Sequence, residues 1–144
     1  MQEYIDFFQN NMILSLVWLG LLIAVISMTI KTSSAAYKTI SAHQVTHLIN
    51  KEEGVVVDIR SKEDFKRGHI IDSYHVLPTD IKEARYPSLE KKKQSPIILV
   101  CKLGNTAQQS ANELVKAGFE NVHVLKGGIS SWQEANLPLI RGKK

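Results

Sequence analysis

The chain has 144 residues, a formal net charge of +4 and one cysteine. Its length suits a single small domain, and a lone cysteine excludes the internal disulfides that hold many small secreted domains together. The basic excess shows no stripe of lysine and arginine interleaved with aromatic residues, so we expect no nucleic-acid partner.

The first segment is apolar and almost free of charge. No charged residue occurs from Phe7 to Ile30. A helix of about 20 apolar residues spans the roughly 30 Å hydrocarbon core of a bilayer. A cleaved signal peptide is the alternative, but the chain starts with the acidic letters MQEYID, whereas export signals usually start with basic residues. We predict a short N-terminal tail over 1–11 and a transmembrane helix over 12–30.

The charges on either side of this helix predict its orientation. Glu3 and Asp6 precede it, whereas Lys31 and Lys38 follow it. Because lysine and arginine accumulate on the cytoplasmic side of membrane helices, we expect a single-pass protein of the inner (plasma) membrane with a cytoplasmic C-terminal domain. Membrane lipid is then a partner of the N-terminal helix, and a membrane protein is a further candidate partner. An unpaired thiol fits the reducing cytoplasm.

The first half of the remaining chain alternates helix and strand. After a small, polar linker over 31–39, Ser41 and Gln44 have the spacing of a capping box that starts a helix. The run VVVDI at 55–59 is continuous and rich in β-branched residues, which is typical of a strand buried on both faces. Ser61 then stands where it would cap a short helix.

The second half continues this alternation. We predict, in order, an irregular segment or brief strand at 69–78, short helices at 81–86 and 89–93 separated by Pro87, a strand at 96–100, a helix at 106–117, a strand at 122–125 and a last helix around Trp132. Each main strand is apolar throughout, which indicates a parallel sheet covered by helices on both faces. The sequence therefore predicts an α/β domain over 40–144.

Cys101 directly follows the strand at 96–100, at the carboxyl end where open α/β sheets bind ligands. The backbone N–H groups of the next loop, and the positive end of the helix that starts at Thr106, favour a negative charge at this point. Lys102 adds a cation, and Gly104 permits a tight backbone. We therefore predict a thiolate nucleophile. The alternative is a cysteine that serves as a small buried hydrophobic residue.

Three motifs, in order and at matching spacing, resemble the rhodanese family. They are the stretch VVVDIRSKEDFKRGHI, the loop that runs from Cys101 to Thr106, and the stretch LVKAGFENVHVLKGGISSWQEANLPL. The resemblance covers residues 40–144 and implies a rhodanese-like parallel sheet. It also implies sulfurtransferase chemistry, in which Cys101 takes the outer sulfur of thiosulfate, a persulfide or a polysulfide and passes it to a small or protein-borne thiol. No metal or organic cofactor is implied.

The resemblance assigns roles to individual residues. Cys101 is the catalytic residue, and the loop after it binds substrate through its amides and charge. The substrate-binding loop residues are Lys102, Leu103, Gly104, Asn105 and Thr106. Structural support is assigned to Asp58, Arg60 and His69. For Asp58 and Arg60 we expect an ion pair or a helix cap that involves Glu63 or Asp64, and for His69 we expect hydrogen bonds that anchor a loop.

The loop departs from the family pattern at three positions. Family loops often read Cys-Arg-x-Gly-x-Arg-Ser, whereas here Lys102 and Thr106 replace the two arginines and Ala107 replaces the hydroxyl residue. A lysine is a point charge and does not hold an oxyanion in the bidentate manner of arginine. We therefore expect thiosulfate to bind weakly and a persulfide carried on a protein to be the better donor.

Alternative functions remain open at this point. A phosphatase of the same fold would need an arginine where Ala107 stands. A membrane-tethered rhodanese-like module would bind a partner protein and transfer little sulfur. His43 and His47 lie one helical turn apart and would bind a metal only with a third ligand, so we expect solvent-facing histidines and no metal site.

Overall fold

The chain forms two units in the computed structural model, Met1–Ala35 and Ala36–Lys144. The structure describes residues 1–33 and 36–142. The first unit consists of helix α1 (Gln2–Asn10) and helix α2 (Met12–Ser33). Among the described residues no single helix is both long and apolar enough to cross a membrane, whereas α1 and the part of α2 up to Met28 satisfy this test together, as a pair bent by 98°.

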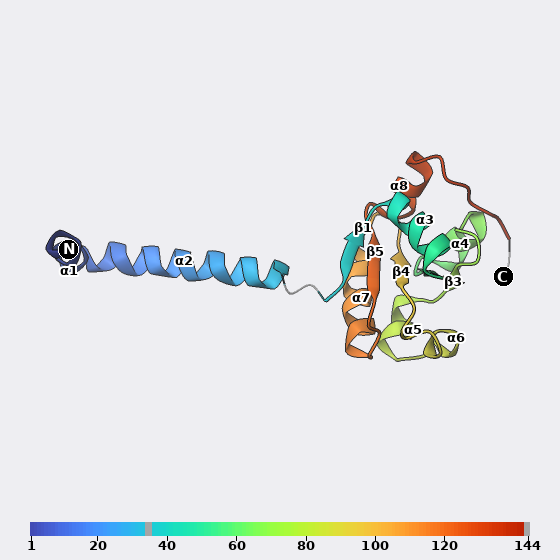
Figure 1. The fold of residues 1–144 in the computed structure, drawn as a ribbon, viewed down its shortest axis with the longest axis horizontal. Helices are drawn as coiled ribbons and strands as arrows, with labels where there is room; N and C mark the ends of the chain where they lie inside the picture. The colour runs from blue at the N-terminus through green and yellow to red at the C-terminus, as the bar shows by residue number, and fades with distance from the viewer. Residues whose placement is uncertain (34–35, 143–144) are drawn as a thin grey trace. The chain divides into compact units, whose positions relative to one another are not determined.

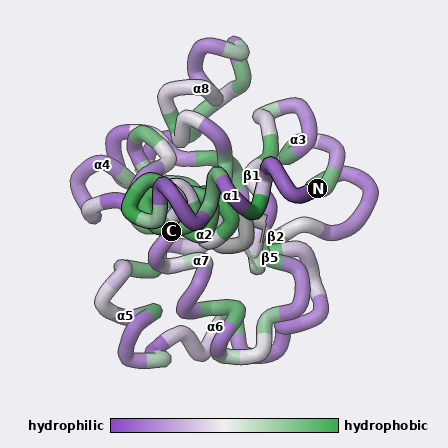
Figure 2. Tube along the Cα trace, turned by 90° about the vertical axis from the view of Figure 1, so that its left-hand side faces the viewer, coloured by the Kyte–Doolittle hydropathy of each residue, from purple (hydrophilic) through white to green (hydrophobic). Residues whose placement is uncertain are grey.

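The two helices of the first unit differ in polarity. Figure 2 shows α2 largely in the green of hydrophobic residues. In α1, Tyr4, Phe7 and Phe8 recur at helical spacing on one side, and Asp6 lies on the other. Residues 1–11, expected as a tail, therefore form mainly an amphipathic helix, because their apolar residues repeat every three to four positions.

The linker expected over 31–39 is shorter in the structure. Helix α2 begins at Met12, as predicted, but continues to Ser33. The first strand then begins at Lys38, so both ends of the expected linker belong to regular structure. Residues 34–35 lie outside the described part of the chain.

The second unit is built on a five-stranded parallel sheet with the strand order β1-β5-β4-β2-β3 (Figure 1). The strands are β1 (Lys38–Ile40), β2 (Val55–Asp58), β3 (Tyr74–His75), β4 (Ile97–Val100) and β5 (Val122–Leu125). The prediction of a parallel α/β sheet is confirmed. Strand β1 was missing from the prediction because Lys38 and Thr39 are exposed at the sheet edge and give no apolar run.

Helices cover both faces of this sheet. They are α3 (Ala42–Lys51), α4 (Lys62–Arg67), α5 (Pro78–Lys82), α6 (Pro87–Glu90), α7 (Thr106–Lys116) and α8 (Gly128–Glu134). One core cluster joins alternate strand residues such as Leu99 to Leu114 of α7, and the other joins Ile98 to Val45 of α3 and Trp132 of α8. Figure 1 shows α7 and α3 on opposite sides of the strands. This layering leaves the carboxyl end of the central strand β4 free for a site.

The helix starts follow the local signals. Ser41 accepts a hydrogen bond from the Gln44 amide at 3.4 Å, and the Gln44 side chain accepts one from the Ser41 amide at 2.9 Å, so the predicted capping box is present. Ser61 caps α4 by accepting from the Asp64 amide at 3.2 Å. Helices α5 and α6 begin earlier than predicted, because a proline occupies the first helical position, where its missing N–H costs nothing.

A buried histidine on β5 makes the stability of the domain depend on pH. His123 is 6% exposed, and neither of its ring nitrogens has a hydrogen-bond partner among the described residues. Burial lowers the pKa of His123 below its usual 6.5, and repulsion from Lys38 lowers it further, while Glu52 opposes the shift. The unfolded chain therefore binds this proton more readily than the folded one, so acid favours unfolding.

We expect the free energy of unfolding to fall as the pH is lowered from about 7.5 to about 5.5, through the ordinary pKa range of histidine. A His123→Leu variant should lose much of this pH dependence, because leucine stays neutral. Urea unfolding at several pH values measures the effect. His43→Gln, at an exposed position, is the matched control and should keep the wild-type slope. Equal slopes for all three proteins would contradict the assignment.

Candidate active site

Cys101 lies at the carboxyl end of β4, the central strand of the sheet, as the sequence predicts. Its side chain is 4% exposed. The chain then makes a tight loop through Gly104 and enters α7 at Thr106. The sulfur is therefore held inside a strand–loop–helix turn.

The loop directs a backbone donor at the sulfur. The amide of Gly104 donates a hydrogen bond to Sγ of Cys101 over 2.9 Å. Gly104 adopts a φ of +93°, a conformation that L side chains rarely reach, and this turn brings its N–H back toward the sulfur. The first N–H groups of α7 have no partner within the helix, and its first turn carries no acidic residue. All these features favour a negative charge on the sulfur.

The sequence predicts a ring of loop amides around the sulfur. In the structure, which describes residues 1–33 and 36–142, one amide of this loop, that of Gly104, donates a hydrogen bond to Sγ. Lys102, Leu103, Asn105 and Thr106 are all exposed, and Leu103 is 62% exposed. The loop thus presents its side chains outward while its glycine faces the sulfur.

Helix α8 holds this loop through hydrogen bonds to its carbonyl groups. The amide of Ile129 donates to the carbonyl of Cys101 over 2.8 Å, and the hydroxyl of Ser130 donates to the carbonyl of Lys102 over 3.3 Å. Gly128, with φ at +61°, lies so close that an added Cβ would overlap the Cys101 carbonyl oxygen and stand 2.7 Å from the carbonyl carbon and oxygen of Lys102. Sequence reasoning missed this support; the adjacent glycines at 127–128 were the available signal.

Ala107, in the first turn of α7, is fully buried in the core. A phosphatase of this fold would need an arginine there, facing the loop. The structure instead packs a methyl group against Ala111 and Leu114 in one apolar cluster. This position therefore offers no anion-binding side chain.

Asp58 and Arg60 form a buried ion pair with each other at the end of β2. The Arg60 guanidinium donates to both carboxylate oxygens of Asp58, at distances from 2.7 to 3.1 Å, and also to the carbonyl of Gly68 at 2.6 Å. The side chains are 1% and 9% exposed. The expected involvement of Glu63 or Asp64 is absent from the contacts of the described residues, because the two partners lie close enough to satisfy one another.

We expect Arg60→Lys to lower the free energy of unfolding by about 2 kcal/mol, because an ammonium cannot reproduce the bidentate contact and the bond to Gly68 together. Urea unfolding curves measure the change. Arg85→Lys is the matched control, since Arg85 also pairs with two carboxylates but is 64% exposed. The control should shift stability by less than about 0.5 kcal/mol. Similar losses in both variants would contradict a special role of the buried pair.

His69 joins α4 to the C-terminal segment. Its Nδ1 lies 2.8 Å from the Phe65 carbonyl, and its ring stacks on Phe65 with 3.8 Å between the centroids. Its backbone exchanges two hydrogen bonds of 2.9 Å with Ile140. The contacts of His69 are therefore structural, and the side chain is 2% exposed.

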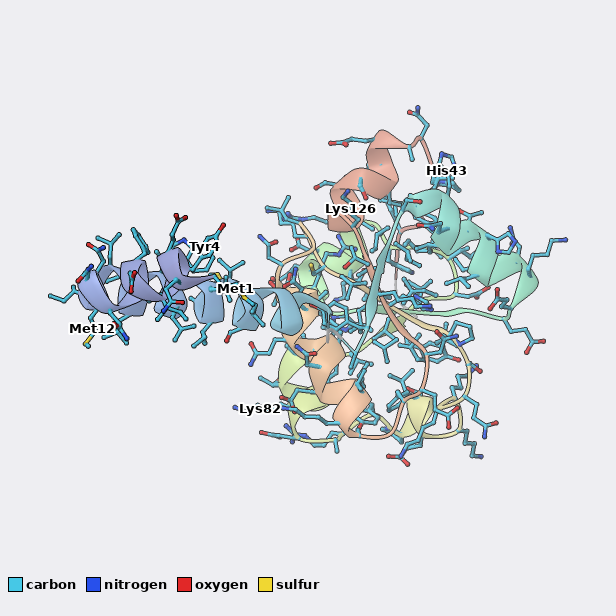
Figure 3. The ribbon with its side chains drawn as sticks, turned by 60° about the vertical axis from the view of Figure 1, so that its left-hand side comes forward. Met1, Tyr4, Met12, His43, Lys82 and Lys126 are labelled. Carbon is cyan, nitrogen blue, oxygen red and sulfur yellow. The ribbon has the colours of Figure 1, made fainter. Side chains whose placement is uncertain are left out.

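His43 and His47 face solvent on α3, and Figure 3 shows His43 projecting away from the helix. Within the described ranges, no three histidine, cysteine, aspartate or glutamate side chains are grouped in a way that could hold a metal ion.

The fold and the site define an α/β protein with one cysteine in a tight loop at the end of its central strand. Residues 41–135 match the family model described as Rhodanese-like domain. The chain therefore belongs to the rhodanese-like domain family.

The chain is similar to known proteins over different lengths. It is 46% identical over 143 residues to the uncharacterized protein YibN of Escherichia coli strain K12, covering 99% of this chain and 100% of that relative. It is 37% identical over 100 residues to the thiosulfate sulfurtransferase GlpE of Pseudoalteromonas translucida, covering 69% of this chain and 92% of that one. The crystal structure of the Alr3790 protein from Anabaena sp. matches with a TM-score of 0.63 and 26% identity, over 71% of this chain and 80% of that chain.

Proposed function

We propose that this protein is a sulfurtransferase in which Cys101 carries the sulfur as a persulfide. The observation that carries the proposal is the hydrogen bond from the Gly104 amide to Sγ, at the carboxyl end of the central strand. The relationship to proteins named thiosulfate sulfurtransferase supports it. A buried sulfur that accepts a backbone N–H is prepared to carry negative charge.

The reaction has two displacement steps. The Cys101 thiolate attacks the outer sulfur of the donor, a new Sγ–S bond forms, and the donor's sulfur–sulfur bond breaks with its electron pair leaving on sulfite or on a thiolate. An acceptor thiolate then attacks the outer sulfur, the Sγ–S bond breaks, and the electron pair returns to Sγ. No net oxidation occurs. The Gly104 amide stays beside Sγ and stabilises its charge before the first step and after the second.

Lys102 suggests which donor is used. Its exposed ammonium is a point charge beside the loop, where a bidentate guanidinium would clamp thiosulfate better. The apolar side chain of Leu103 is also exposed at this loop. An organic or protein-borne persulfide or polysulfide, with an apolar part, suits this surface better than a small oxyanion that needs a bidentate clamp.

Mass spectrometry of the full chain, purified in detergent, tests the proposal. Treatment with a polysulfide or an organic persulfide should add the mass of one sulfur atom, and a subsequent thiol should remove it. Thiosulfate should load the protein more slowly. Absence of added sulfur with every donor would contradict the proposal and favour the alternative, a rhodanese-like interaction module.

The first unit is proposed as a membrane anchor with the C-terminal domain in the cytoplasm. Helix α1 and the part of α2 up to Met28 together have the length and composition of a span, and no charge occurs between Phe7 and Ile30. The apolar side of α1, with Tyr4, Phe7 and Phe8 exposed, suits the membrane interface, at a bend of 98° to α2. Lys31 and Lys38 on the C-terminal side support the cytoplasmic orientation.

Protease protection tests this orientation. In intact spheroplasts, added protease should leave the C-terminal domain uncut, and after detergent lysis the same domain should become accessible. The chain should also remain in the membrane fraction after a high-salt wash, because apolar burial does not weaken with ionic strength. Digestion in intact spheroplasts would contradict the orientation, and release by salt would contradict the anchor.

A further inference from the structure

A cleft of about 440 Å³ lies beside the cysteine loop, and its charged lining is mainly basic. Four basic side chains line it, Arg60, Arg67, Lys102 and Arg141, together with one carboxylate, Asp64. We call this the basic cleft. Lys102 comes from the cysteine loop itself, so the cleft begins one residue from Cys101.

Two of these cations have no acidic partner in the described residues. Arg60 is neutralised by the buried carboxylate of Asp58, and Arg67 has Asp64 at 3.8 Å. Lys102 and Arg141 form no ion pair within residues 1–33 and 36–142. The basic cleft therefore has a positive excess that an anionic ligand would neutralise.

Hydrogen bonds to the backbone fix the segments that carry Lys102 and Arg141. The residues on both sides of Arg141 are hydrogen-bonded to the end of α4 and the segment just after it. Ile140 bonds to His69 over 2.9 Å, and the Gly142 amide donates to the Lys66 carbonyl over 3.2 Å. On the other wall, the Ser130 hydroxyl donates to the Lys102 carbonyl over 3.3 Å. Arg141 and Lys102, far apart in the sequence, thus line the same cleft.

The size of the basic cleft indicates the kind of anion. Pockets for small organic ligands have volumes of about 300–1,000 Å³, so this cleft is larger than a lone inorganic anion needs. One molecule with two negative groups would neutralise both unpaired cations at once. The reactive thiol of that molecule would lie toward Cys101, past the carboxylate that pairs with Lys102.

We infer that the basic cleft binds the carboxylates of the acceptor, and that the acceptor class is a small organic thiol with at least two carboxylates. This inference rests on the proposed sulfur transfer. The carboxylates pair with Lys102 and Arg141, with Arg67 also in the lining, while the acceptor thiolate attacks the outer sulfur on Cys101. The Sγ–S bond breaks, and the outer sulfur leaves on the acceptor as its persulfide.

A transfer experiment on the full chain, loaded with sulfur in detergent, tests the inference. Mercaptosuccinate, with two carboxylates, is compared with neutral 2-mercaptoethanol, and the ratio of their second-order rate constants is measured. The ratio should favour mercaptosuccinate and should fall about fivefold in Arg141→Gln, the loss expected for one exposed ion pair. It should fall further in the double variant with Arg67→Gln, and also with added salt.

Arg85→Gln is the matched control. Arg85 is likewise an exposed arginine, but it pairs with acids elsewhere and does not line the basic cleft, so its variant should keep the wild-type ratio. An unchanged ratio in Arg141→Gln, or an equal fall in the control, would overturn the inference while leaving sulfur transfer intact.

A binding measurement separates failure of the inference from failure of the proposed function. The S-methyl ether of mercaptosuccinate cannot accept sulfur, so its binding is independent of catalysis. NMR titration of the full chain should shift the amides of Lys102, Ser130 and Arg141, and the shifts should disappear in Arg141→Gln. Shifts elsewhere, or shifts that persist in that variant, would overturn the inference even in a protein that transfers no sulfur.

Discussion

Cys101→Ser should abolish sulfur loading while leaving the domain folded. A serine hydroxyl is nearly the same size as the thiol and can accept the same N–H bond from Gly104, so packing around it is kept. It is not ionised at neutral pH, and its oxygen cannot form the sulfur–sulfur bond in which Cys101 would carry the transferred sulfur. We expect no measurable added sulfur and a change in unfolding free energy of less than about 1 kcal/mol.

Two measurements on the same protein check this expectation. Mass spectrometry after polysulfide treatment reports the added sulfur, and urea unfolding reports the fold. Because the chain has no other cysteine, any sulfur retained by the variant would come from a site other than a thiol. Loading at the wild-type level would exclude Cys101 as the carrier. Loss of the fold would instead show that the cysteine is mainly a packing residue.

Among the substitutions that add one methyl group near the site, Gly128→Ala should destabilise the domain most. The new Cβ would overlap the Cys101 carbonyl oxygen and stand 2.7 Å from the Lys102 carbonyl, which are backbone atoms that no rotamer change can move away. The φ of +61° adds the strain of a left-handed conformation. Together we expect a loss of about 4 kcal/mol, from overpacking and from backbone strain.

Gly118→Ala separates the two causes. Gly118 ends α7 with a φ of +95°, but an added Cβ meets nothing within 4 Å. This control should lose only about 1–2 kcal/mol, the cost of the conformation. Urea unfolding of both variants measures the difference, and the initial rate of sulfur loading in Gly128→Ala should fall because the loop is displaced. Equal stability losses would show that the contact between α8 and the loop is loose.

The fold was predictable where a signal is local. The apolar runs at β2, β4 and β5 identify buried parallel strands, and Ser41 with Gln44 identifies the start of α3, because each depends on neighbouring residues. The edge strand β1 was not predictable in the same way. It exists because Lys38–Ile40 pairs with His123–Leu125, more than 80 positions away in the chain.

The candidate site was predictable only in part, for the same reason. The place of Cys101 between a strand and a helix is visible in the sequence. The support of its carbonyl by Ile129, and the approach of Arg141 to the basic cleft, depend on segments that meet only after folding. Asp58 and Arg60 are only two residues apart and pair through a local turn. The motif indicated a structural role for both residues, but it did not indicate that they pair with each other rather than with Glu63 or Asp64.

The lone cysteine limits how a sulfur on this protein can be discharged. A persulfide next to a second thiol in the same chain would resolve into an internal disulfide and release sulfide, but this chain offers no such resolving partner. Each molecule therefore has a capacity of one sulfur, and the sulfur leaves only through an encounter with another molecule. With Sγ almost enclosed by its loop, the frequency and geometry of those encounters set the turnover.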